Sequence, residues 1–406
     1  MPQSSESEER APSFDELTAL YKRFLRLFAL LPLEGRDFSG AVSRLILVYC
    51  LAWSSVYWSM MVFYVASLSG APTVDAICET VVVVGVSLRY YLLLLRRSEL
   101  VALMDESRAI WEACGGGGGE GRRAVHRFER KVRRLFKLLL GSCCFTILMF
   151  SASAASATRH SAAAANGTEH ARFLPFKWYS ERGPDLWPGY GLNFALQLLV
   201  TQSAGMAAAT VDSTGAFLLM LGAGYFRALR RRLLRAADRP ASADSELLAC
   251  VRLHQRVLGL CSRTDKLTGG LFFVQLLCTG YNLSLIGIKL AGTDPDRFKF
   301  VPLLLASLSA LFICQWAADH LIQESTAIST AAYSVSLPWM GRRMGKLLVL
   351  VIARSQRPVQ MTAAGVVHLS IENFGSVRPR VHDPATLYTL CFPRRCSPAQ
   401  SPFSPC

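Results

Sequence analysis

Long runs without Asp, Glu, Lys or Arg alternate with charged segments along this chain of 406 residues. The uninterrupted runs are 45–74, 138–158, 186–211, 267–288 and 300–318, and a sixth run, 80–95, contains only Arg89. About 20 apolar residues in a helix cross the hydrocarbon core of a bilayer. The pattern therefore predicts membrane-spanning helices, because a soluble protein of this length would alternate apolar and polar positions.

A seventh apolar stretch is weaker because charges divide it. Residues 347–353 and 359–371 are separated by "RSQRP", in which Pro358 removes a helical donor and disfavours helical geometry at Arg357. A continuous helix would place these charges in lipid, which is costly, so we expect a break with the arginines near the membrane surface. The predicted fold class is all-α: a polytopic membrane protein with seven transmembrane helices, the seventh split in two.

The distribution of Lys and Arg predicts the orientation. The segments 1–43, 96–134, 222–268 and 322–346 together hold 28 of these residues, against 6 in the alternate loops 66–75, 158–190 and 291–299. Cytoplasmic loops carry the excess, so the N-terminus is predicted to be cytoplasmic. The triplet "NGT" makes Asn166 a glycosylation acceptor in a loop assigned to the outside, which agrees. A G-protein-coupled receptor has the opposite orientation, and its Asp-Arg-Tyr and Asn-Pro-x-x-Tyr motifs are missing.

The composition and the absence of known motifs argue against several classes of site. The chain is 51% hydrophobic with mean hydropathy +0.29 and formal charge +15. Its 12 cysteines include no Cys-x-x-Cys pair, so neither a metal site nor a disulfide framework is predicted. No Ser/His/Asp set, P-loop or His-Glu-x-x-His motif is present, and we expect neither an enzyme nor a cofactor. The polar first 23 residues do not form a signal peptide, so the first spanning helix is expected to direct insertion.

Two basic stretches have apolar residues at helical spacing. Residues 127–140 are predicted to continue from the cytoplasm into the third span, and residues 225–240 to prolong the fourth. Two interpretations stay open. The arginines either sit near anionic headgroups, each worth about 1 kcal/mol, or the helices form a cytoplasmic bundle used for subunit assembly.

The last third of the chain carries the most specific motifs. From Leu311 to Val377 it reads "LFICQWAADHLIQESTAISTAAYSVSLPWMGRRMGKLLVLVIARSQRPVQMTAAGVVHLSIENFGSV". The order and spacing of its motif residues resemble those of an insect odorant receptor. Two earlier segments, "LYKRFLRLFALLPL" and "VDSTGAFLLM", resemble the same family more weakly. The motif residues are Cys314, Trp316, Leu321, Glu324, Ser325, Ala332, Tyr333, Trp339, Arg354, Gln356, Pro358, Asn373 and Phe374.

The resemblance implies a function that the residues alone do not give. It implies an odorant-gated, non-selective cation channel, formed as a hetero-tetramer with a shared co-receptor subunit in the plasma membrane of a sensory dendrite. Volatile apolar small molecules and the lipid bilayer are the other partners, and no nucleic acid is expected. The co-receptor has a much longer loop where this chain has 222–268, so this chain resembles an odour-tuning subunit. The resemblance also implies a set of family-motif and assembly residues, which are Tyr333, Trp339, Arg354, Gln356, Pro358 and Phe374.

The expected organisation follows from the spans and the resemblance together. It comprises a cytoplasmic segment over 1–43, transmembrane helices 1–6 over 44–322 with basic cytoplasmic loops at 96–134 and 222–268, the cytoplasmic anchor and pore-side parts of helix 7 over 323–377, and a divergent, disordered tail over 378–406.

An odorant pocket should be concave, apolar and aromatic-rich with few polar anchors. The family places it within the outer halves of spans 2, 3, 4 and 6, although each single position is more often ordinary bundle packing. The candidate lining residues are Val84, Ser87, Thr146, Phe150, Phe194, Leu198, Met206 and Ser307.

Two further groups are candidates for function. Ser370, Asn373 and Ser376 would form one polar stripe on a helix, and with Val377 they are candidate pore-lining residues, helix packing being the alternative. His368 and Glu372 would share a helical face. Arg89, Asp212 and Lys289 are charges in or beside spans, and we interpret them as boundary or bundle-internal charges.

Beyond Val377 the sequence departs from the family pattern. Arg378, Pro379 and Pro384 interrupt the expected helix, and residues 391–406 have a Pro/Ser-rich composition typical of disorder. Either the helix ends near the interface, or the coding sequence leaves the family pattern at a splice junction after Val377. We favour the second interpretation, under which the pore helix is incomplete and binding or assembly could persist without gating.

Other function classes are weighed against the odorant receptor. A gustatory receptor of the same superfamily usually ends its last helix with Thr-Tyr, five residues and Gln-Phe, a motif missing here. A seven-helix transporter or a G-protein-coupled receptor is the alternative from another class, and an N-terminal tag accessible on intact cells would favour the latter.

Overall fold

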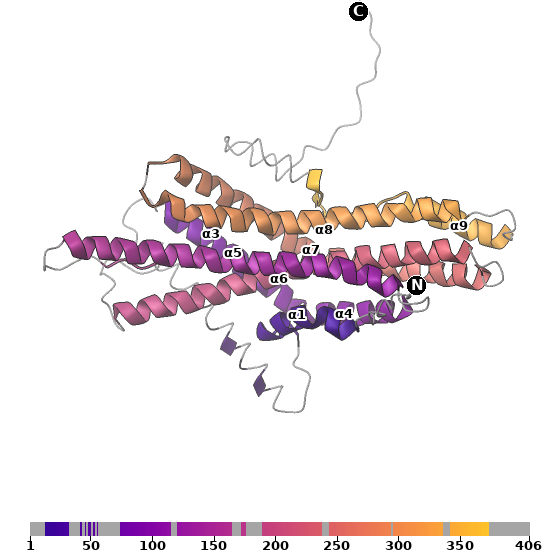
Figure 1. Ribbon diagram of the computed structural model, residues 1–406, viewed down its shortest axis with the longest axis horizontal. Helices are drawn as coiled ribbons and strands as arrows, with labels where there is room; N and C mark the ends of the chain where they lie inside the picture. The colour runs from indigo at the N-terminus through magenta and orange to yellow at the C-terminus, as the bar shows by residue number, and fades with distance from the viewer. Residues whose placement is uncertain are drawn as a thin grey trace, which may run out of the picture.

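The computed structural model shows an elongated bundle of long helices (Figure 1). The residues that it describes are 13–31, 41, 42, 45, 48, 49, 52, 55, 74–114, 120–164, 172–175, 189–237, 243–293, 295–335 and 342–372. The elements are α1 (Phe14–Leu27), α3 (Val74–Leu95), α4 (Arg97–Ala113), α5 (Glu120–Ala164), α6 (Tyr190–Ala237), α7 (Ala243–Ala291), the 3₁₀ helix η2 (Pro295–Lys299), α8 (Phe300–Ser334), α9 (Arg342–Ser355), β1 (Thr362–Ala363) and β2 (Val367–His368).

Five helices in the described ranges are long and apolar enough to cross a membrane. They cover Ile77–Leu95, Val125–Ala163, Tyr190–Ala236, Asp244–Ala291 and Arg297–Ser334. Each overlaps one of the predicted charge-poor runs, so the second to sixth predicted spans are confirmed as helices. The first predicted span, 45–74, lies almost wholly outside the described residues. The two predicted basic extensions are also confirmed, because α5 and α6 run for 45 and 48 residues.

Helix α6 is the centre of the bundle. It packs against α1, α3, α4, α5, α7 and α8. Its residues from Ala209 to Phe226 are buried without a break, whereas an amphipathic helix exposes one face. Small residues such as Ala216, Gly222 and Ala223 let neighbouring helices approach it from several sides.

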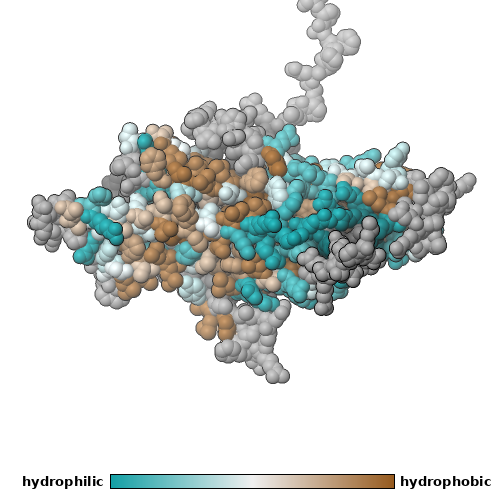
Figure 2. All heavy atoms as spheres, in the orientation of Figure 1, coloured by the Kyte–Doolittle hydropathy of each residue, from teal (hydrophilic) through white to brown (hydrophobic). Residues whose placement is uncertain are grey.

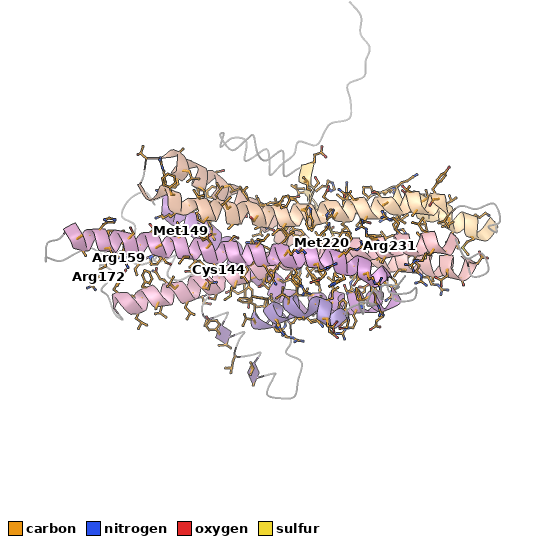
Figure 3. All side chains as sticks on the ribbon, viewed as in Figure 1. Cys144, Met149, Arg159, Arg172, Met220 and Arg231 are labelled. Atoms are coloured by element: carbon orange, nitrogen blue, oxygen red, sulfur yellow. The ribbon has the colours of Figure 1, made fainter. Side chains whose placement is uncertain are left out.

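The bundle divides along its length into two halves with different surfaces. The apolar half comprises 74–89 of α3, 139–164 of α5, 190–212 of α6, 271–291 of α7 and 300–313 of α8. The basic half comprises α1, α4, 120–138 of α5, 213–237 of α6, 243–270 of α7 and 314–334 of α8. Figure 2 shows apolar residues gathered over the first and polar residues over much of the second. In Figure 3, Arg159 and Arg172 lie at the far end of the apolar half, and Arg231 lies in the basic half.

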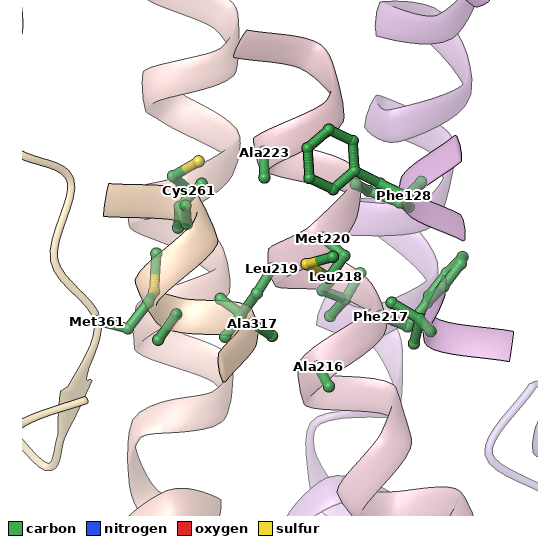
Figure 4. Packing of buried hydrophobic residues seen from close by; sticks show 14 of the residues in the cluster. Phe128, Ala216, Phe217, Leu218, Leu219, Met220, Ala223, Cys261, Ala317 and Met361 are labelled. Atoms are coloured by element: carbon green, nitrogen blue, oxygen red, sulfur yellow. The ribbon is translucent and has the colours of Figure 1, made fainter. Parts of the chain in front are cut away.

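The basic half has a dense aromatic and aliphatic core. The ring of Tyr21 on α1 stacks on Phe217 of α6 with centroids 4.1 Å apart, and both side chains are at most 2% exposed. Phe128 of α5 packs beside Ala223, and Met361 lies near Cys261 and Ala317 (Figure 4). The basic extensions therefore belong to a helical bundle with its own core.

Helix α1 is fixed at its start by a capping box. The Ser13 hydroxyl accepts from the Glu16 N–H, and the Glu16 carboxylate accepts from the Ser13 N–H. These bonds satisfy two donors that a helix start leaves unpaired. At its end, Leu25, Phe28 and Leu30 are buried against the bundle, so α1 is a docked helix of the basic half.

The segment after α9 corrects one prediction. Helix α9 ends at Ser355, three residues before Pro358, so this helix does not continue through the proline. The helical spacing expected for "TAAGVVHLS" is wrong, because residues 362–368 form an antiparallel hairpin with Thr362 opposite His368. Ala364 and Gly365 take positive φ angles in its turn, which reverses the chain within a few residues. His368 and Glu372 therefore do not share a helical face.

The hairpin docks on α7 in the basic half. Thr362 donates its N–H to Asp265 Oδ1 at 2.7 Å, and Ala364 donates its N–H to the Gly269 carbonyl at 3.0 Å. Val359 donates its N–H to Ser325 Oγ of α8 at 3.1 Å. These bonds replace helical hydrogen bonds for a segment that Pro358 has removed from the helix.

Candidate ligand-binding cavity

A cavity of about 180 Å³ lies inside the apolar half, between α3, α5, α6, α7 and α8. An apolar cavity of about 150 Å³ encloses a molecule the size of benzene. The cavity therefore has room for a ligand with a single ring or a short chain.

Small apolar side chains form most of the wall. On α6 the lining positions are Thr201, Ala204, Gly205, Ala208, Ala209 and Asp212, a helical face of small residues that ends in a carboxylate. The facing walls are formed by Val82, Val83 and Val86 of α3, and by Leu303, Ala306 and Ala310 of α8. The one lining aromatic ring among the described residues is Phe150 of α5, which packs edge-on against Phe300 at 5.6 Å between centroids. Small side chains leave the space open, because the backbones are held apart by packing in both halves.

An ion pair lines the end of the cavity that adjoins the basic half. Arg89 of α3 donates from Nη1 to Asp212 Oδ1 of α6 and from Nε to the Gly85 carbonyl at 3.0 Å. The two side chains are 8% and 7% exposed. Taking either charge out of water is costly, and each offsets the cost of burying the other. The prediction that these charges are bundle-internal is confirmed, and Lys289 is half-buried near the end of α7.

Further polar groups border the cavity elsewhere. Glu79 contributes a carboxyl from α3, and Asn282 of α7 accepts from the Cys78 thiol at 2.6 Å. The hydroxyls of Thr146 and Thr201 donate to carbonyls of their own helices, at 2.9 and 2.7 Å. A hydroxyl whose proton is donated to its own helix can offer only its oxygen lone pairs to a ligand in the cavity.

Half of the candidate pocket residues line this cavity. Ser87, Thr146, Phe150 and Ser307 belong to the lining, and Val84, Phe194, Leu198 and Met206 do not. Val84 and Met206 are not in the lining, although their neighbours Val83 and Gly205 are. Phe194 and Leu198 share the lining face of α6 but lie further toward its N-terminus, beyond the cavity. There Phe194 packs against Tyr190 at 5.9 Å between ring centroids.

The other candidate residues are more scattered. Tyr333 is 75% exposed at the end of α8, and Arg354 donates to the Arg357 carbonyl at 3.1 Å. Gln356 is exposed and Pro358 half-buried beyond α9. Ser370 precedes a helical turn that begins at Ile371. Asn166, Trp339, Asn373, Phe374, Ser376, Val377 and the tail 378–406 lie outside the described residues.

The sequence contains a signal for further lining residues of α6 that are not among the predicted pocket residues. Thr201, Ala204, Gly205, Ala208 and Asp212 recur at intervals of three and four, which marks one helix face of small residues. Arg89 was singled out as a charge, but its partner is 123 residues away on another helix. Charge alone could not pair them, since several other acidic residues were available.

Comparison with known proteins identifies relatives of this chain. The profile of the family described as "7tm Odorant receptor" matches residues 69–378. Odorant receptor 10 of Aedes albopictus is 24% identical over 200 residues, covering 47% of this chain and 52% of that protein. Odorant receptor Or2 of Anopheles gambiae is 24% identical over 199 residues, covering 46% and 53%. The chain thus matches about half the length of these relatives.

A solved structure has the same fold. The insect olfactory receptor OR5 from Machilis hrabei, determined in complex with eugenol, superposes with a TM-score of 0.75 at 14% sequence identity. The superposition covers 93% of this chain and 98% of OR5. The fold, a bundle of membrane-spanning helices, is therefore that of an insect olfactory receptor.

Proposed function

Because the chain belongs to the 7tm odorant receptor family, we propose that it binds a volatile small molecule in the cavity between α3, α5, α6, α7 and α8. The observation that carries the proposal is the cavity itself: a partly open, mostly apolar space, large enough for one small ligand, within the helices predicted to cross the membrane. The family is one of receptors and not of enzymes, and a cavity with this lining supports binding of an apolar guest.

We propose further that the chain acts as an odour-tuning subunit of a non-selective cation channel in the plasma membrane, together with a shared co-receptor. Helix α6 ends at Ala237 and α7 begins at Ala243, which fits the short loop of a tuning subunit. Tyr333, Val349 and Leu350 are 75%, 62% and 65% exposed, so α8 and α9 offer apolar surface to a neighbouring subunit. In this proposal α9 is the assembly part of the seventh helix, and the segment beyond Ile371 belongs to the pore.

The test is odour-evoked current in cells that express the chain with the co-receptor. We expect some of a panel of small volatiles to evoke a cation current from the pair. The same compounds should evoke no current from cells that express either subunit alone. To place the ligand, Ala208→Phe puts a ring into the cavity from the lining face of α6. We expect it to raise the half-maximal odour concentration at least tenfold, because the ring competes for the ligand's space.

A matched control separates this effect from damage to the helix. Ala195 lies on the exposed surface of α6, so Ala195→Phe adds the same ring outside the cavity. Both variants are compared at equal surface expression. Silence of the wild-type pair across a broad panel, with no volatile raising the melting temperature of the purified complex, contradicts the receptor proposal, whereas silence with binding identifies a subunit that does not gate. An unchanged response of Ala208→Phe contradicts the cavity as the binding site.

A further inference from the structure

The ion pair at the end of the cavity has hydrogen-bonding capacity left over. A guanidinium carries five N–H donors in a fixed planar fork. In the part of the chain that the structure describes, Arg89 uses one on the Asp212 carboxylate and one on the Gly85 carbonyl. The side chain is more than nine-tenths buried and lines the cavity, so little bulk water competes for its remaining donors. A buried donor of this kind favours any acceptor that can reach it.

The charges around Arg89 decide which acceptors fit. Asp212 neutralises the guanidinium, and the Glu79 carboxyl lines the same cavity. An anionic ligand would lose its hydration and meet these carboxyls for the gain of an arginine that is already paired. A neutral carbonyl or ether oxygen accepts a hydrogen bond from the charged donor at a much lower desolvation cost.

The remaining wall fits a hydrocarbon body attached to such an oxygen. Val82 and Val86 of α3 and Phe150 of α5 are apolar, and the lining residues Thr146 and Thr201 donate their hydroxyl protons within their own helices. Asn282 lies on α7 and also carries amide donors, while its Oδ1 accepts from Cys78. Arg89 is the charged donor of the lining, and bonds to charged donors are roughly twice as strong as neutral ones.

We propose that Arg89 is the polar anchor of the ligand, and that the cavity selects neutral, oxygen-bearing volatiles of single-ring or short-chain size. The ligand's acceptor oxygen lies against the guanidinium, and its hydrocarbon part lies toward Phe150. Asp212 acts through Arg89 as a positioning residue that holds the guanidinium in place and cancels its charge. This inference rests on the proposed odorant-binding function and names its ligand class.

The test compares compounds of one shape and different polarity. Acetophenone, isopropenylbenzene and benzoate share a ring and a planar branch, and differ in presenting a carbonyl, a methylene or a carboxylate. An open-chain set of 2-hexanone, 2-methyl-1-hexene and pentanoate repeats the comparison without the ring. Half-maximal concentrations are measured as current with the co-receptor, alongside a broad volatile panel. We expect each ketone to be about 10- to 100-fold more potent than its alkene, the usual worth of a hydrogen bond from a charged donor, and the carboxylates to be the weakest.

Variants then assign the preference to Arg89. The double variant Arg89→Met/Asp212→Leu removes the pair as a unit, which avoids leaving one buried charge alone. We expect the ketone advantage to disappear while the alkene keeps or improves its potency. Arg89→Lys keeps the charge but loses the planar fork, so a smaller advantage is expected at normal surface expression. The control Arg232→Met/Glu246→Leu removes another α6 ion pair, 3.0 Å long and outside the cavity lining, and should leave the advantage intact.

The outcomes separate this inference from the receptor proposal. Equal potency of ketone and alkene in the wild type, or a ketone advantage that survives in the double variant, overturns the role of Arg89 alone. Responses confined to hydrocarbons or carboxylates overturn the proposed ligand class. If the pair is silent to the whole panel, the same compounds are compared by the rise in melting temperature that each gives the purified complex. The absence of a rise with every compound contradicts the receptor function, and this inference with it.

Discussion

The two halves of the bundle use the same helices for opposite purposes. In the basic half, α6 is surrounded on every side, and its residues from Ser213 to Phe226 are all buried. In the apolar half, the lining face of the same helix carries Thr201, Ala204 and Ala208, which border open space. Continuous packing fixes the helix in one half, and small side chains leave room in the other. Stability is therefore concentrated in the basic half, and ligand selection in the apolar half.

The largest expected effect comes from emptying the aromatic core of the basic half. Phe217→Ala removes a ring that is 1% exposed and stacked on Tyr21 at 4.1 Å. Loss of a buried Phe costs about 3–5 kcal/mol. We expect a large drop in the apparent melting temperature of the detergent-purified protein and little protein at the cell surface.

The matched change in the apolar half should behave differently. Phe150 is 3% exposed, but its ring borders an existing cavity, so Phe150→Ala enlarges that space without opening a new one. We expect a smaller fall in melting temperature and a shift of preference toward bulkier volatiles. If both variants lose the same stability and Phe150→Ala keeps its size preference, the two halves do not differ as proposed.

The sequence predicts the properties of single segments better than the contacts between segments. Charge-free runs predicted the spans, because one helix must satisfy its own backbone in lipid wherever it packs. The extensions of α5 and α6 followed from apolar residues such as Phe128 and Val132 at helical spacing. These are local properties of one segment, which a single sequence displays.

The cavity depends on relations between segments, which the sequence does not display. Arg89 and Asp212 meet across 123 residues, and Phe194 misses the cavity because its helix turn lies beyond the open space. The hairpin 362–368 was missed for a related reason. Its composition suits a membrane helix, but the positive φ angles of Ala364 and Gly365 and the acceptors Asp265 and Gly269 make a turn.

A second prediction compares the two halves by adding one methyl group to a glycine of α6 in each. A Cβ at Gly224 would lie 3.0 Å from Val125 Cα, an atom of the α5 backbone that cannot turn aside. A Cβ at Gly205 would meet Ile147 Cδ1 at 3.4 Å, an ordinary contact with a side chain that borders the cavity. We expect Gly224→Ala to destabilise by about 1–3 kcal/mol through overpacking.

Gly205→Ala is the control, and the opposite sign is expected for it. Replacing a helical Gly by Ala favours the helix by about 1 kcal/mol where space allows, so its melting temperature should stay or rise. The added methyl also narrows the cavity, which should weaken responses to the largest active volatiles. Equal destabilisation by both substitutions would contradict the difference in packing between the halves.

The smallest expected effect concerns a surface contact of the basic half. Asp15 of α1 accepts from Lys22 Nζ at 2.6 Å and from Arg108 Nη2 of α4 at 2.5 Å, and its side chain is 64% exposed. The hydrogen bond from Lys22, with the charge of Arg108, lowers the pKa of the Asp15 carboxyl below its usual value. Its contribution to stability is therefore present above the pKa of the unfolded chain, about 4, and is lost as pH falls through the lower pKa of the folded protein.

Asp15→Asn should remove this contribution and its pH dependence together. An exposed pair is worth about 0.2–1 kcal/mol, so we expect a slight fall in melting temperature at pH 7 and low salt. The difference from wild type should shrink at high salt, through screening, and vanish in acid once Asp15 is protonated in both states. The buried face of α1, with Leu17, Tyr21 and Leu25 at most 2% exposed, would still hold the helix in place. A loss as large as that of Phe217→Ala would mean that the ion pair, and not this apolar face, docks α1 on the basic half.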